Sequence, residues 1–102
     1  MGGFDPRARF RPVPEVVGRR VGDECVLVEL HTNRMYELNT TGARIWELLA
    51  AGQDLGGIEA QLQEEFDIGG ATLRSELLGL LGRLRAEGLV TIEAMGEGAG
   101  EG

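Results

Sequence analysis

The stretch LNTTGARIWELLAAG, residues 38–52, marks the point at which the hydrophobic pattern of the chain changes from strand-like alternation to helical spacing. Asn39 or Thr40 can cap the start of a helix, because a side-chain oxygen at that position accepts a hydrogen bond from a free backbone N–H. Gly52 suits the left-handed conformation that often follows the last turn. The stretch therefore predicts the end of a strand and a capped helix that places the only tryptophan, Trp46, in or near the core.

Before this helix, three short apolar runs are bounded by turn residues and predict β-strands. They are EVVGRRV, CVLVEL and MYEL, at residues 15–21, 25–30 and 35–38. The connections GDE and HTNR are short, and short connections join antiparallel strands because parallel neighbours need a long crossover. We therefore expect a three-stranded antiparallel sheet.

After the first helix, apolar residues at steps of three and four predict two more helices. Asp54 can cap the second helix, and the third runs from Ala71 or Thr72 to Glu87, where Gly88 ends it. The run LVTIE then forms a final extended segment. Because the strands precede the helices instead of alternating with them, the predicted fold class is α+β, a three-stranded antiparallel sheet followed by three helices.

Composition predicts three parts of the chain. Residues 1–14 are rich in Arg and Pro, and we expect a disordered arm. Residues 15–93 form the folded domain, and residues 94–102, dominated by Gly and Glu, form a disordered tail.

The charge of the chain argues against a nucleic-acid partner. Ten arginines and 17 acidic residues give a net charge of −7. Residues 39–67 carry one arginine and six acids, and the last predicted helix, residues 72–87, carries three arginines and two acids. A protein that binds nucleic acid needs a clearly basic face to neutralise phosphates. We also find no secretory signal pattern and no apolar run long enough to span a membrane, so we expect a cytoplasmic protein without a membrane partner.

Residues that could perform chemistry are few. Cys25 and His31 are the only cysteine and the only histidine, which excludes a Cys/His zinc cluster and argues against a catalytic triad. Cys25 lies in an apolar run that predicts a buried, inert thiol, and His31 lies in an exposed turn. The sequence NTTG lacks the spaced glycines and the lysine of a phosphate loop. We therefore expect no enzymatic activity, no cofactor and no metal.

The third predicted helix carries two apolar stripes. The first has the spacing of an ordinary core face and contains Leu73, Leu77, Leu80 and Leu84. The second lies about a quarter turn away and contains Arg74, Leu78, Leu81 and Arg85. Two interpretations remain open. The arginine stems could pack along the edge of a wide core face, or the second stripe could form one wall of a groove for an acidic peptide. The strand at residues 35–38 would then be the other wall and an edge for strand addition.

The order and spacing of these elements resemble the PqqD-like family, the peptide-recognition elements of pathways that modify ribosomally made peptides. The matching pattern is an apolar strand, a turn, a strand ending in Leu-Asn, an Ile-Trp helix closed by glycine, and a last helix closed by Gly-Leu. It covers about residues 16–90, and it is filled by Tyr36, Leu38, Asn39, Ile45, Trp46, Leu48, Leu49, Gly52, Leu84, Gly88 and Leu89.

The resemblance implies a winged-helix-like fold and makes residues 15–93 a PqqD-like peptide-recognition domain. It also implies that the domain binds the leader segment of a precursor peptide as an added β-strand between the third strand and the third helix. In this arrangement the strand supplies backbone pairing, the leucines floor an apolar pocket, and the helix arginines meet acidic leader residues. The predicted peptide-binding residues are Arg34, Met35, Tyr36, Glu37, Leu38, Arg74, Leu77, Leu78, Leu81 and Arg85.

The resemblance further implies a separate processing enzyme as a partner. The sequence looks most like the small leader-binding proteins (B1 type) of lasso-peptide pathways, which present the leader to a cysteine protease. The related domain of pyrroloquinoline quinone synthesis works with a radical SAM enzyme instead. A winged-helix DNA-binding regulator is a further interpretation, supported by Arg74, Arg83 and Arg85 on the last helix and opposed by the acidic charge.

Overall fold

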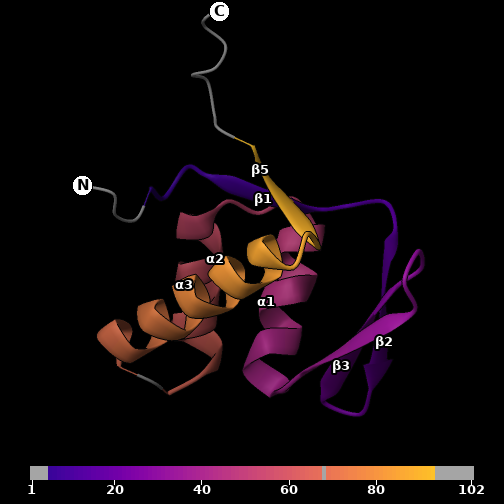
Figure 1. Cartoon of the computed structure of the whole chain (residues 1–102). Coiled ribbons are helices and arrows are strands. Elements are labelled where there is room, and N and C mark those ends of the chain that lie inside the picture. The colour runs from indigo at the N-terminus through magenta and orange to yellow at the C-terminus, as the bar shows by residue number, and fades with distance from the viewer. Residues whose placement is uncertain (1–4, 68, 94–102) are drawn as a thin grey trace, which may run out of the picture.

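The computed structural model describes residues 5–67 and 69–93, and these residues form two small antiparallel sheets and three helices (Figure 1). One sheet has the order β2-β3-β4, formed by Val16–Val21, Glu24–Glu29 and Arg34–Leu38. The three helices follow directly and are α1 (Thr40–Ala50), α2 (Leu55–Glu65) and α3 (Gly70–Ala86). The predicted α+β class, with a three-stranded antiparallel sheet followed by three helices, is confirmed.

Turn chemistry sets the register of the three-stranded sheet. Gly22 and Asn33 take the left-handed conformation, with φ of 64° and 61°, in the two connections. In the second connection, the backbone N–H and the hydroxyl of Thr32 both donate to one carboxylate oxygen of Glu29, at 2.7 and 2.9 Å. The backbone donor is the largest cause that lowers the pKa of Glu29. These contacts hold the hairpin of β3 and β4.

The predicted helix caps are present. The side chain of Asn39 accepts a hydrogen bond of 2.8 Å from the backbone N–H of Gly42, and Asp54 does the same for Gly57. Gly88 follows α3 with a φ of 77°, which places Leu89 in the core at 0% exposure.

The N-terminal segment is part of the fold. Strand β1 (Arg9–Pro12) pairs antiparallel with β5 (Val90–Glu93), and Figure 1 shows this pair lying beside the helices. Ala8 and Phe10 are buried. The prediction of a disordered arm is therefore wrong for residues 5–14. Backbone hydrogen bonds join Pro6 and Ala8 to the start of α2, residues 9–12 to β5, and Val13 to Leu89. Residues 1–4 and the predicted tail, 94–102, lie outside the described residues.

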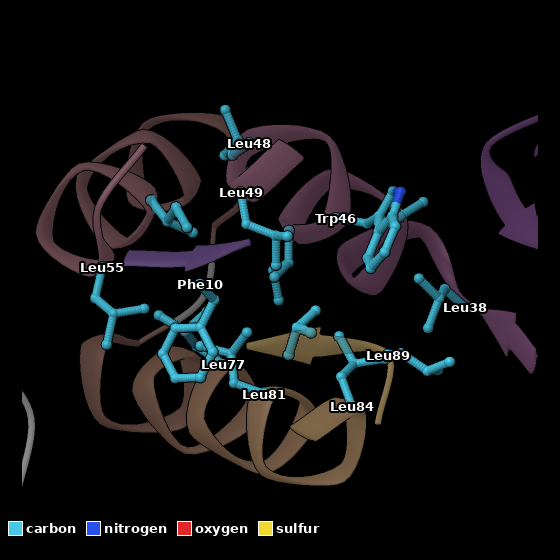
Figure 2. Packing of buried hydrophobic residues seen from close by; sticks show 14 of the residues in the cluster. Phe10, Leu38, Trp46, Leu48, Leu49, Leu55, Leu77, Leu81, Leu84 and Leu89 are labelled. Carbon is cyan, nitrogen blue, oxygen red and sulfur yellow. The ribbon is translucent and has the colours of Figure 1, made fainter. Parts of the chain in front are cut away.

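One apolar core joins both sheets to the helices (Figure 2). Phe10 of β1, Leu49 of α1 and the α3 leucines fill its centre, and Leu38 and Trp46 extend it toward the three-stranded sheet. Trp46 is 7% exposed, as predicted for a core residue. Cys25 is also buried, and its loss of hydration raises the pKa of the thiol.

Gly18 allows Trp46 to pack against strand β2. A Cβ atom at Gly18 would lie 2.7 Å from the indole nitrogen and 3.5 Å from the sulfur of Cys25. The first separation is too short for a real contact, so α1 reaches the sheet only because position 18 has no side chain.

A polar network connects the elements outside the core. The Arg44 guanidinium on α1 donates two hydrogen bonds of 2.8 Å to Glu65 at the end of α2. It also donates to Glu47, which pairs with Arg20 of β2. Gln61 donates a further hydrogen bond to Glu65. The bonds from Arg44 are the main reason that the pKa of Glu65 falls to about 2.

None of the helices in the described part of the chain has the length and apolar character that a membrane crossing requires.

We predict that Gly18→Ala destabilises the protein by about 1–3 kcal/mol, because the added methyl group must displace a buried indole. Urea unfolding followed by the fluorescence of Trp46 would measure the loss and report the altered indole environment. The matched control is Gly82→Ala on α3, where a Cβ meets no atom within 4 Å. This control should stabilise the helix by about 0.5–1 kcal/mol. Equal effects of the two substitutions would contradict the packing argument.

We also predict a pH-dependent contribution from Glu65. Its pKa falls from 4.5 to about 2 on folding, so the contribution is fully present above pH 4.5 and is lost as the pH falls toward 2. The wild type should exceed Glu65→Gln in unfolding free energy by about 0.5–1 kcal/mol near neutral pH, and the difference should disappear near the low-pH end. Denaturant titrations across this range would measure it. Glu64→Gln is the control, since Glu64 makes no ion pair or hydrogen bond with the described residues. A difference that stays constant across the range would contradict the assignment.

Candidate functional site

Strand β4 has one unpaired edge. It pairs with β3 on one side and with no other strand of the described chain. In an antiparallel pair, the backbone groups of alternate residues point away from the partner, so β4 presents unpaired N–H and C=O groups. Its side chains also alternate, since Tyr36 is half-buried and Leu38 is 4% exposed, whereas Met35 is 66% exposed. The open edge therefore has an inner side that faces the helices.

A hollow of about 500 Å³ lies on this inner side, between the end of β4, the first turn of α1 and one face of α3. This size is within the usual range of ligand sites. Its apolar lining comes from Leu38, Ile45 and the half-buried Leu80. A Cβ at Gly42 would lie in ordinary contact with the end of Leu80, at 3.5 Å, so α1 and α3 lie close together where both line the hollow. Its remaining lining residues are Glu24, Glu37, Asn39, Thr41, Gly42, Glu76, Gly79 and Arg83.

Glu87, just after α3, connects that helix to the start of β4. The Tyr36 hydroxyl donates a hydrogen bond of 3.2 Å to the Glu87 carboxylate, and Arg34 pairs with the same oxygen at 3.7 Å. Partial loss of hydration is the largest cause that raises the pKa of Tyr36, so the phenol remains a donor at neutral pH. Since the end of β4 meets the middle of α3 and its start meets the end of α3, the two elements run in opposite directions along the groove.

The structure brings together only part of the predicted site. The β4 residues, Arg34 to Leu38, lie at the sheet edge as predicted. Leu77 and Leu81 are 0% and 1% exposed and belong to the core, and neither lines the hollow beside β4. Arg74 and Leu78 line a separate hollow between α2 and α3, where Arg74 donates two hydrogen bonds to Glu59.

The remaining predicted residue, Arg85, is exposed and does not line the hollow beside β4. Arg74, Leu78 and Arg85 thus lie away from this hollow, and its α3 side is formed by Glu76, Gly79, Leu80 and Arg83. Of these, Leu80 was predicted to face the core.

The α3 residues at the hollow differ from the predicted ones because the other side of the core stripe faces the sheet. The buried residues Leu73, Leu77, Leu81 and Leu84 fix one face of α3, and the helix then has two flanks. Helical spacing alone does not tell which flank meets β4. Glycine inside the helix gave no signal either, because Gly79 lines the hollow and Gly82 does not, although a Cβ meets no atom within 4 Å at both positions.

The search of curated protein sequences gave no match. Solved structures with the same fold include one described as "TbiB1 in Complex with the TbiA(beta) Leader Peptide", which is 29% identical with a TM-score of 0.73. That match covers 78% of this chain and 93% of the other. A second, described as "Lasso peptide synthetase B1 complexed with the leader peptide", is 22% identical with a TM-score of 0.73 over 81% and 98% of the two chains, and at this identity it supports the fold alone.

The family described as "Coenzyme PQQ synthesis protein D (PqqD)" matches residues 24–90. This range runs from the start of β3 to the start of β5, and so includes β4, all three helices and every residue that lines the hollow. Because the match extends over well over half of the sequence, the chain belongs to the PqqD family.

Proposed function

We propose that the protein binds the leader segment of a ribosomally made precursor peptide as an added β-strand on the free edge of β4. The observation that carries this proposal is the position of that edge, which borders a hollow of about 500 Å³ shared with α1 and α3. An added strand would form backbone hydrogen bonds with β4, and every second side chain would enter the hollow. Backbone pairing supplies affinity, and the hollow supplies selectivity.

The comparisons support the ligand class. The TbiB1 structure, 29% identical to this chain, is described as a complex with a leader peptide, and it aligns over most of both chains. The resemblance of the fold to the lasso-peptide B1 protein is consistent with it. The hollow of this chain is built from the elements that the PqqD match covers.

The proposed role includes no chemistry on the peptide. The protein would hold the leader extended and present the rest of the precursor to a separate processing enzyme. We favour the leader protease of a lasso-peptide pathway, because the sequence resembles the B1 proteins of such pathways and one structure of the same fold is described as a lasso peptide synthetase B1. A radical SAM enzyme, as in pyrroloquinoline quinone synthesis, is the alternative within the same family.

We predict that Gly79→Leu weakens leader binding by at least about tenfold, since it places a side chain in the hollow. The ligand is a fluorescently labelled leader half of the precursor peptide encoded beside this protein, and anisotropy measures the affinity. Gly82→Leu is the matched control on the same helix. A Cβ meets no atom within 4 Å at either glycine, and Gly82 does not line the hollow. Equal affinity of both variants and the wild type would place the peptide elsewhere.

Leu78→Glu tests the alternative position on α3. Leu78 is 39% exposed and lines the hollow between α2 and α3. We expect this variant to bind the leader like the wild type. A loss of affinity in Leu78→Glu, without a loss in Gly79→Leu, would transfer the site to the α2–α3 hollow. Random duplex DNA is the control ligand, and salt-dependent binding of DNA alone would favour a DNA-binding role instead.

A further inference from the structure

The hollow beside β4 has an excess of negative charge. Three of its lining residues are glutamates, Glu24, Glu37 and Glu76, and one is an arginine, Arg83. Among the described residues, none of these four side chains forms an ion pair or a hydrogen bond. One cation against three carboxylates leaves the walls at −2 (three negative charges less one).

Several carboxylates elsewhere on the surface have partners, although the side chains of Asp23, Glu64 and Asp67 have none among the described residues. Glu65 and Glu47 share Arg44, and Glu59 pairs with Arg74. The opposite end of the groove is also neutralised, because Glu87 pairs with Arg34 and accepts from Tyr36. Three carboxylates without partners therefore lie together at the Leu38 end of β4, around the space that the peptide would occupy.

Resting on the proposed function, we infer that the bound leader strand places a lysine or arginine side chain at the Leu38 end of β4, between Glu37 and Glu76. A peptide strand laid over this end excludes water from the carboxylates, which is costly unless a cation accompanies it. Apolar side chains of the same strand would lie on Ile45 and Leu80. The ligand class is thus an extended peptide with a basic residue next to apolar residues, which differs from the acidic leader that the resemblance implied.

The difference in unpaired charge between the two ends of β4 also sets the register of the peptide. Backbone pairing along β4 is equally possible in several registers, because every residue carries the same backbone groups. A single basic side chain is stabilised at the Leu38 end and gains nothing at the Glu87 end, where Arg34 already occupies the carboxylate. The basic residue would therefore select one register.

The first arm of the test changes the protein. Glu37→Gln combined with Glu76→Gln removes two charges from the hollow and keeps the size of the side chains. The matched control is Glu64→Gln combined with Asp67→Asn, which removes the same charge from exposed residues outside the hollow. We expect the first pair to weaken leader binding by about threefold to tenfold at low salt, and the control pair to change it by less than about twofold. The loss should shrink as added salt shortens the range of the attraction.

The second arm changes the peptide. Three forms of the leader half of the encoded precursor are synthesised. One has the encoded sequence, one has its lysines and arginines replaced by glutamine, and one has its acidic residues replaced by glutamine. Removal of the cations should weaken binding to the wild type by about threefold to tenfold, and should have little further effect in the Glu37→Gln, Glu76→Gln protein. Removal of the acids should leave binding unchanged or tighter.

The outcomes separate this inference from the proposed function. If the cation-free leader binds as tightly as the encoded one, the charge inference is overturned and leader binding stands. Equal losses in the two protein variants would also overturn it, because the attraction would then come from net charge and not from the hollow. If no form of the leader binds, both proposals fall.

Discussion

A single residue, Asn39, joins the edge strand to the first helix, and the site depends on this short junction. Its backbone is still extended, and its side chain accepts the hydrogen bond that starts α1. With no loop between them, the last residue of β4 and the first turn of α1 are forced into the same small space. Leu38 is therefore buried, and Gly42 lies next to Leu80 of α3. A longer connection would let α1 move away from the sheet and would remove the inner wall of the groove.

The elements that could be predicted from sequence are those with local signals. The strand runs, the two side-chain caps and the glycines after α1 and α3 act within a few residues, and the structure contains all of them. Strand β1 had no local signal, because Arg9 to Pro12 are extended only through pairing with residues 90–93. Its apolar content is limited to alternate positions such as Ala8 and Phe10 in a segment rich in Arg and Pro. Composition therefore indicated disorder where tertiary contact provides order.

The strand side of the candidate site could be predicted from sequence and the helix side could not, for a related reason. The edge position of β4 follows from strand order in a meander of three, so residues 34–38 could be assigned. The contribution of α3 depends on the rotation of the helix about its own axis relative to the sheet, and no pattern within the helix contains that information. Burial of Leu81 instead of Leu80 moves the centre of the buried face by only about 25°, at about 100° per residue. The exchange of Arg74 and Leu78 for Gly79 and Arg83 therefore comes mainly from which flank of that face meets the hollow.

The pairing of β1 with β5 has a consequence for how such a domain can be combined with others. Arg9 is opposite Glu93 in the register, so the first and last strands of the described chain lie side by side. Neither strand lines the hollow beside β4. A domain whose first and last strands pair, and whose proposed binding edge belongs to another sheet, is suited to insertion into a loop of a larger protein. It is equally suited to fusion at either terminus, with little disturbance of the hollow beside β4. The pairing of β1 with β5 thus allows the domain to be combined with other domains, because the strands next to the points of attachment and the proposed binding strand β4 belong to different sheets.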